Sequence, residues 1–209
     1  WSIKRLVRRI VLSRTFRLSA RRQPEAVSID PLNRLLHHFQ AGRLDAESIR
    51  DAVLATSGRI SLQLGGASVY PFRDKPNTDR RLFVGPLDGH GRRSLYIKTN
   101  LMEPTRFLSV FNTPGGKVVE GRRDSSNVPA QALAMLNNSF MTTMSRHFAH
   151  RVSAETPRLA DQVRRAVNLA LSRPPAAEEV RLLTTYARRH GLPNACRLIL
   201  NLNEFVFVE

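Results

Sequence analysis

The sequence predicts a mostly α-helical, irregular multi-helix domain over residues 1–209, with two long loops and at most short strands. Apolar residues recur at helical spacing through most of the chain, and helix-start and helix-stop residues flank those segments. Two stretches, near residues 59–92 and 112–128, are instead rich in Gly, Pro and charge. Hydrophobic residues make up 42% of the chain, which is enough for a sizeable core.

The first helix is predicted near the N-terminus, where apolar residues follow helical spacing. They are Ile3, Leu6, Val7, Ile10 and Val11. Residues 1–24 also hold eight basic residues and no acid. We interpret this segment as an amphipathic helix that docks on the body of the protein with its arginines in water. The alternative is a helix that binds a membrane or a polyanion.

A helical hairpin is predicted next. Asp30-Pro31 has the character of an N-cap followed by Pro at the first helical position, and Gly42 would end that helix. Its apolar stripe would be Leu32, Leu35, Leu36 and Phe39. Asp45 would cap a second helix that ends at Gly58. Within the first helix the adjacent His37 and His38 would point to different faces.

Irregular structure is predicted for residues 59–92, with short strands at most near Leu62 or over 82–84. Residues 94–97 form a short apolar run that fits a strand or a helical turn. Residues 112–128 form the second loop. Loops of this length inside a compact domain are often functional.

The C-terminal part is predicted to be helical throughout. One long helix would run from Pro129 to about Val152, and a second from Pro157 to Leu171. A third would carry acidic residues in its first turn and end at Gly191, and a final segment would follow Pro193.

Several classes of chemistry find no support in the sequence. The single cysteine excludes an intrachain disulfide, a Cys-rich zinc site and a C-x-x-C-H haem attachment site, so no cofactor is expected in this chain. Cys196 lies among apolar residues and is predicted to be a small buried hydrophobe. His147 and His150 are three residues apart but lack a nearby carboxylate, so no metal ligand is assigned. We assign no catalytic residue either.

The charge balance favours an acidic partner. The chain has 33 Lys+Arg and 17 Asp+Glu, which gives a net charge of +16. An anionic glycan, another polyanion or an acidic neighbouring domain would match it. Aromatic residues are only 7% of the chain and no nucleic-acid-binding motif is present, which argues against sequence-specific nucleic-acid recognition. No run of 18 apolar residues occurs, so no membrane span is expected.

An anion site is predicted around the second loop. Asn127 could cap the helix that Pro129 opens, and Arg122 and Arg123 could supply a bidentate contact. The full set of candidate ligand-binding residues is Arg92, Arg93, Asn100, Arg122, Arg123, Asn127 and Gln131. The alternative is that Arg122 and Arg123 pair with acidic residues and fix the loop. Those acidic residues would be Glu103, Glu120 or Asp124.

Several motifs together resemble a known family. They are Trp1–Leu6 with Leu12–Arg17, Asp30–Leu36, Arg43–Ala52 with Ser57-Gly58, Arg92–Tyr96 with Asn100, Phe111–Pro114, Arg122-Arg123, Asn127–Asn137, Leu171–Glu179 and Asn201–Phe205. The chain is similar to the planctomycete-specific C-terminal domain of unknown function found in large secreted proteins alongside c-type cytochrome domains. The resemblance implies a periplasmic, cell-envelope or extracellular location, neighbouring domains in cis, and haem in such a neighbour. It transfers no catalytic residue.

The leading hypothesis is a non-catalytic interaction or docking module of a secreted or cell-envelope multidomain protein, which binds an acidic ligand. Because the chain begins at Trp1, we expect it to be a fragment of such a protein. One alternative is an enzyme that acts on an anionic polysaccharide, and another is a support domain for a c-type cytochrome. A cleft lined with clustered carboxylates or histidines would favour an enzyme, whereas a cleft lined by Arg and Asn would favour binding.

Overall fold

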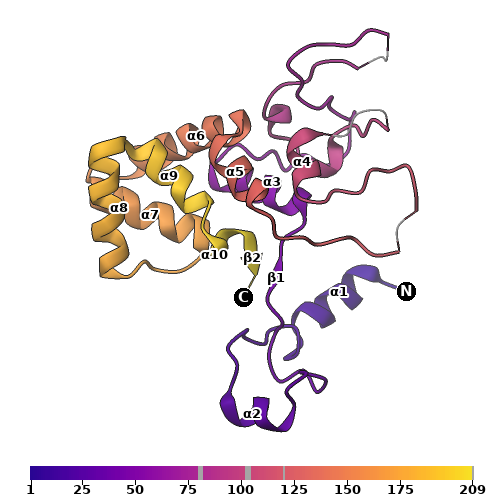
Figure 1. The fold of residues 1–209 in the computed structure, drawn as a ribbon, viewed down its shortest axis with the longest axis vertical. Coiled ribbons are helices and arrows are strands. Elements are labelled where there is room, and N and C mark those ends of the chain that lie inside the picture. The colour runs from indigo at the N-terminus through magenta and orange to yellow at the C-terminus, as the bar shows by residue number, and fades with distance from the viewer. Residues whose placement is uncertain (80–81, 102–104, 120, 209) are drawn as a thin grey trace. The chain divides into compact units, whose positions relative to one another are not determined.

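The computed structural model describes residues 1–79, 82–101, 105–119 and 121–208. Contacts divide the chain into two compact units. The N-terminal unit comprises Trp1–Arg43 with Phe207–Glu209, and the helical unit comprises Leu44–Val206. The described residues form ten α-helices and one two-stranded sheet, which confirms the mostly α-helical prediction (Figure 1). The expectation of one domain over residues 1–209 stays a prediction.

The N-terminal unit contains α1 (Ile3–Val11), α2 (Pro24–Ile29) and a short antiparallel sheet. The hydroxyl of Ser2 accepts the N–H of Arg5 at 3.3 Å and so caps α1. The predicted first helix is therefore confirmed, while its docking stays a prediction. The sheet pairs β1 (Gly42–Arg43) with β2 (Phe207–Val208).

The predicted helix after Asp30 is wrong, and so is the helical hairpin. The Asp30 carboxylate accepts the N–H groups of Arg34 at 2.9 Å and Leu35 at 2.7 Å, and these bonds lower the pKa of that carboxyl group. Asn33 and Leu36 adopt φ of +53° and +55°, which no right-handed helix contains. The short polar side chain closes a turn in place of a helix.

The loss of that helix also changes the geometry of the histidine pair. In a turn, His37 and His38 do not diverge as neighbours on a helix would. Their Nδ1 atoms lie 3.3 Å apart and their ring centroids 4.4 Å apart.

The helical unit begins with α3 (Ala46–Thr56), which matches the second predicted helix. Ile49, Val53 and Leu54 are buried on its inner face. The chain leaves the helix through Gly58, whose φ is +74°.

Two helices replace the single long helix predicted from Pro129. They are α5 (Pro129–Asn137) and α6 (Ser139–Glu155), and the prediction of one helix is therefore wrong. The backbone of Asn138 is extended, and its side-chain oxygen accepts the N–H of Phe140 at 2.9 Å. Asn138 thus caps α6 and ends α5.

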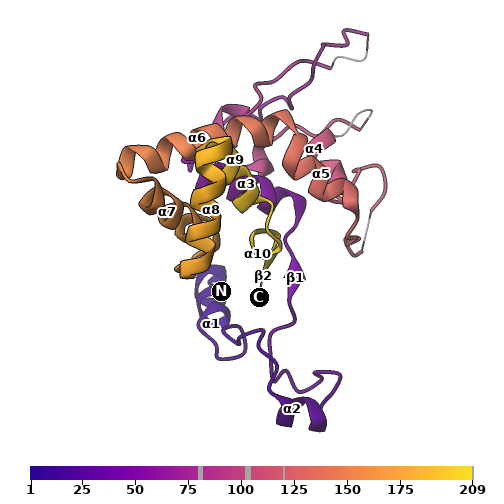
Figure 2. The same cartoon turned by 60° about the vertical axis from the view of Figure 1, so that its left-hand side comes forward.

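The remaining helices follow the prediction closely. They are α7 (Leu159–Leu171), α8 (Ala177–His190), α9 (Leu192–Leu200) and α10 (Asn203–Val206). α6 lies beside both α7 and α9, and α7, α8 and α9 pack against one another (Figures 1 and 2). This four-helix arrangement supports the rest of the helical unit.

The two predicted loops are irregular, as expected. Within residues 59–92, the described residues form isolated bridges such as Ser61–Arg92 and Phe72–Gly85 but no regular strand. Two 3-10 turns follow, η1 (Gly89–Gly91) and η2 (Ser94–Tyr96), so the ambiguous run at 94–97 is a helical turn. Sequence periodicity did not reveal α4 (Arg106–Val110), which is only five residues long.

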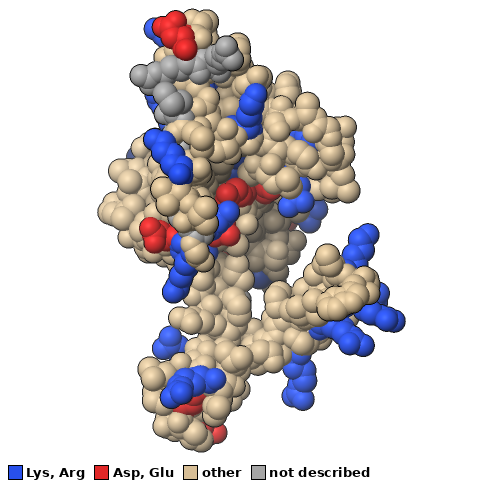
Figure 3. All heavy atoms as spheres, turned by 90° about the vertical axis from the view of Figure 1, so that its right-hand side faces the viewer, with Lys and Arg blue, Asp and Glu red and all other residues tan. Residues whose placement is uncertain are grey.

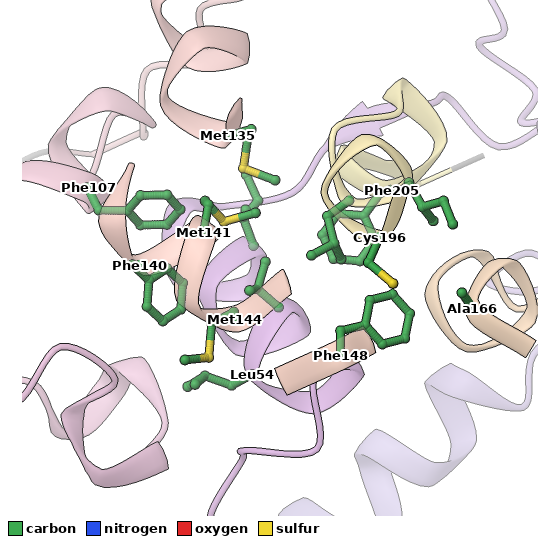
Figure 4. Packing of buried hydrophobic residues seen from close by; sticks show 14 of the residues in the cluster. Leu54, Phe107, Met135, Phe140, Met141, Met144, Phe148, Ala166, Cys196 and Phe205 are labelled. Carbon is green, nitrogen blue, oxygen red and sulfur yellow. The ribbon is translucent and has the colours of Figure 1, made fainter. Parts of the chain in front are cut away.

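The core lies where α3, α6, α7 and α9 meet. Figure 4 shows the aromatic ring of Phe148 beside the sulfur of Cys196, with Met141 and Met144 on the same helix as Phe148. Cys196 is fully buried, and burial raises the pKa of its thiol to about 12. Its prediction as a small buried hydrophobe is confirmed.

A clamp fixes the C-terminal segment. The Arg173 guanidinium donates two hydrogen bonds to Glu179, both at 2.8 Å, and two to Glu204, at 2.5 Å and 2.7 Å. Glu179 also accepts the N–H of Ala176 at 2.7 Å, at the start of α8. The hydrogen bonds from the Arg173 guanidinium and from the Ala176 N–H lower the pKa of the Glu179 carboxyl group to about 2. One side chain thus joins the α7–α8 connection to α10.

We expect Arg173→Met to lower the free energy of unfolding by about 1 to 2 kcal/mol, because four charge-assisted hydrogen bonds are lost from a partly exposed site. Urea denaturation, followed by circular dichroism, measures this change in the free energy of unfolding. Arg181→Met is the matched control, since Arg181 forms an ion pair with Glu178 at an exposed site of α8. An equal loss in the control would contradict the clamp.

The same clamp predicts a dependence on pH. Because folding lowers the pKa of Glu179 to about 2, its stabilising contribution is complete above about pH 4.5 and is lost as the pH falls toward 2. The difference in stability between wild type and Arg173→Met should therefore shrink over that range. A difference that stays constant from pH 6 to pH 3 would contradict the assignment.

Candidate ligand-binding pocket

The buried guanidinium of Arg50 fixes the end of the long loop to α3. Arg50 is 4% exposed, and its Nη1 donates to the Arg92 carbonyl at 3.0 Å. Its Nη2 donates to the Asp88 carbonyl at 2.7 Å. Burial lowers the pKa of Arg50, although Asp51 and Asp88 oppose that effect. A side chain of α3 thereby donates hydrogen bonds to two loop carbonyls, one of which, that of Asp88, also accepts the N–H of Gly91 at 3.1 Å.

Two glycines permit this close approach. A Cβ on Gly89 would lie 2.8 Å from Nη2 of Arg50, and a Cβ on Gly91 would lie 2.0 Å from the Arg59 carbonyl oxygen. Both residues have positive φ, at +62° and +71°. Gly89 therefore allows the turn to approach the Arg50 guanidinium, and Gly91 allows it to approach the Arg59 backbone.

A pocket of about 770 Å³ opens beside Arg50. Its walls come from α3, the loop segment 70–77, the turn at 86–89, the start of α4 and the junction of α5 with α6. This volume is within the range of small-ligand sites. The pocket therefore suits one sugar unit or a few, or a ligand of similar size.

The described lining of the pocket is basic and aromatic. Its basic residues are Arg50, Arg73, Lys75 and Arg106, and its aromatic residues are Tyr70, Phe72, Phe107 and Phe140. Asp74 is the one acidic residue among the described lining residues, and it lies 3.2 Å from Arg106.

The N-terminal end of α6 adds to the positive character of the pocket. Asn138, Ser139 and Phe140 line the pocket; Asn138 is the N-cap of the 17-residue helix α6, and the other two residues begin its first turn. Backbone N–H groups at a helix N-terminus carry partial positive charge. The arrangement can attract an anion and present flat apolar faces to it.

Of the residues that the sequence predicted as ligand contacts, Arg92 binds parts of the loop and Arg93 binds α3. The Arg92 guanidinium lies 3.8 Å from the ring centre of Tyr96, donates to the Gln63 carbonyl at 3.2 Å, and also donates to the Gly65 carbonyl. Arg93 pairs with Asp51 at 3.4 Å.

The side chain of Arg123, in the 112–128 loop, contacts the start of α3. Its Nη1 is 2.7 Å from Glu47 and 3.6 Å from Asp45, which favours the interpretation that this arginine fixes the loop. Arg122 is exposed. Of the acidic partners considered from the sequence, Glu103 and Glu120 lie outside the described residues.

Gln131 is buried and ties α5 to the end of α4. Its Nε2 donates to the Val110 carbonyl at 3.0 Å, and its Oε1 accepts the N–H of Val128 at 3.4 Å. Val128, and not Asn127, is the N-cap residue of α5, so that part of the prediction is wrong. Asn127 is exposed and Asn100 is half-buried.

The seven predicted residues lie on several segments of the chain between Arg92 and Gln131. None of them is among the described residues that line the pocket. Their anion-binding role stays a prediction. Sequence reasoning missed the pocket because its walls come from five distant segments, and only the dense Pro, aromatic and basic residues near 70–76 could have indicated it.

Comparison with known proteins now gives the family. The family model described as PSD1, protein of unknown function (DUF1553), matches residues 1–187. The chain belongs to this family. No curated protein and no solved structure matches the chain. The matched part of this PSD1 chain includes every described residue that lines the pocket.

Among the helices of the described residues, none is long and apolar enough to cross a membrane. Within the same described part of the chain, no group of three or more His, Cys, Asp or Glu residues is arranged to hold a metal ion.

The close approach of the turn at Gly91 to the Arg59 backbone can be tested against a matched glycine, Gly65. Gly65 has φ of +72°, close to the +71° of Gly91, but open space surrounds its Cβ position. Gly65→Ala should cost about 1 kcal/mol from backbone strain alone. Gly91→Ala should cost about 2 kcal/mol or more beyond that, because it also meets the Arg59 carbonyl. Urea denaturation of both variants measures the difference, and equal losses would contradict the close approach.

Proposed function

We propose that this PSD1 chain is a non-catalytic interaction module of a secreted or cell-envelope multidomain protein, and that it binds an acidic ligand in the pocket beside Arg50. The supporting observation is the composition of the pocket: four basic side chains and one acidic side chain among its described lining residues. Arginine and lysine side chains at such a site bind carboxylate or sulfate through charge-assisted hydrogen bonds.

The aromatic residues narrow the ligand class. Tyr70 and Phe72 lie on the loop wall, and Phe107 and Phe140 on the helical wall. Flat apolar rings stack well against the apolar faces of sugar rings, whereas basic side chains bind their acidic substituents. An acidic oligosaccharide combines both properties, and we propose it as the ligand.

The alternative of an enzyme acting on anionic polysaccharide gains less support. Glycoside hydrolysis ordinarily uses two carboxyl groups that flank the scissile bond. The described lining holds one carboxylate, Asp74, which is largely exposed and faces Arg106. No histidine is among the described lining residues.

The wider setting rests on the family resemblance. Secretion or location in the cell envelope, a planctomycete source, and neighbouring domains in cis as partners are part of the proposal. Support of a c-type cytochrome domain is the second alternative, with haem in that neighbour. This chain has one cysteine, so it lacks the two that covalent haem attachment uses.

Affinity for a sulfated or carboxylated oligosaccharide tests the proposal. Titration calorimetry with a heparin-derived tetrasaccharide should show binding that Arg73→Gln/Lys75→Gln weakens about tenfold or more, since two charged contacts are removed. Arg188→Gln/Arg189→Gln is the matched control, because it removes the same charge from the exposed end of α8. This control should bind within about twofold of wild type.

A third variant distinguishes binding in the pocket from binding at the 112–128 loop. Arg122→Ala/Arg123→Ala removes the basic pair that the sequence predicted as an anion site. Loss of binding in this variant alone would move the site to the 112–128 loop and contradict the pocket. Equal weakening in all three variants would indicate diffuse charge attraction, which also contradicts it.

A further inference from the structure

The helix α1 separates apolar from basic side chains. At 100° per residue, Ile3, Leu6, Val7, Ile10 and Val11 fall on one side of the helix axis. Lys4, Arg5, Arg8 and Arg9 fall on the other side, and the helix contains no acidic residue. The helix therefore has a continuous apolar face and a continuous basic face.

The N-terminal unit provides no core for that apolar face. Asp30 and His38 are the buried residues of the described part of this unit, and no apolar side chain in it is buried. Leu6 remains 59% exposed and Ile10 49% exposed. The helical unit, in contrast, buries more than twenty apolar side chains among its described residues. An exposed apolar face of this kind marks an interaction surface.

The basic residues around α1 indicate which kind of partner would cover its apolar face. Residues 1–24 carry eight basic residues and no acid, and Figure 3 shows Lys and Arg side chains projecting from the N-terminal unit. On α1 these side chains lie opposite the apolar face. A protein groove that covered the apolar face would leave them in water on the far side. A planar anionic surface attracts basic side chains on all sides of the helix through its field.

Aromatic residues lie at both ends of this segment. Trp1 precedes α1 and Phe16 follows it, and both are exposed. Trp and other large aromatic side chains favour the boundary between lipid headgroups and acyl chains. From these features we infer that α1 and its flanking residues bind the surface of an anionic lipid membrane, lying in the interface without crossing it.

Vesicle binding tests this inference on the full 209-residue chain. Wild type should sediment with vesicles of mixed phosphatidylcholine and phosphatidylglycerol but not with vesicles of phosphatidylcholine alone. Trp1 is the one tryptophan of the sequence, so its fluorescence should shift to shorter wavelength on binding. Leu6→Gln/Ile10→Gln and Arg8→Gln/Arg9→Gln should each reduce binding about tenfold or more.

Matched controls distinguish the helix from general surface properties. Leu95→Gln/Leu182→Gln alters side chains that are 64% and 55% exposed, and Arg188→Gln/Arg189→Gln removes equal charge. Both controls should bind like wild type. Equal loss in the controls, or no binding of wild type to anionic vesicles, would overturn the inference. A dimer that depends on Leu6 and Ile10 without vesicle binding would identify a second copy as the partner and overturn it too.

Discussion

The buried Arg50 guanidinium is the interaction on which the organisation of the helical unit depends. A charge with 4% exposure is stable only where its donors are satisfied, and here loop carbonyls satisfy them. The loop in turn needs Gly89 and Gly91 to pass close enough. The long irregular segment therefore acquires a defined position without regular secondary structure. The pocket opens beside this attachment, with Arg50 and Gly89 among its described lining residues.

Sequence reasoning succeeded where local signals agreed with packing. The helices α3 and α8 combine regular apolar spacing with clear boundaries, Gly58 for one and Gly191 for the other. Sequence reasoning failed where a short polar side chain could either close a turn or cap a helix. Asp30 and Asn138 both bind backbone N–H groups, but Asp30 closes a turn and Asn138 restarts a helix. The sequence around each residue does not separate these outcomes, because they depend on how the neighbouring segments pack.

The candidate site was less predictable than the fold. The predicted residues were chosen as basic and amide side chains near loops, and the structure shows Arg92, Arg123 and Gln131 bound to other parts of the chain. The pocket instead combines Arg50 with residues 70–77 and with the α5–α6 junction. No spacing rule relates segments that are separated by tens of residues, so only the folded arrangement reveals them. The family match adds no residue-level role to either set.

The pairing of β1 with β2 has a consequence for how the protein is made. Gly42 and Arg43 form their ladder with Val208 and Phe207, at the opposite end of the sequence. A ribosome releases the N-terminal residues first, so the first strand waits through the synthesis of about 160 residues before its partner emerges. All of α3 to α10 becomes available for folding during that interval. Assembly of the helical unit can thus precede completion of the N-terminal unit, even though the latter is translated first.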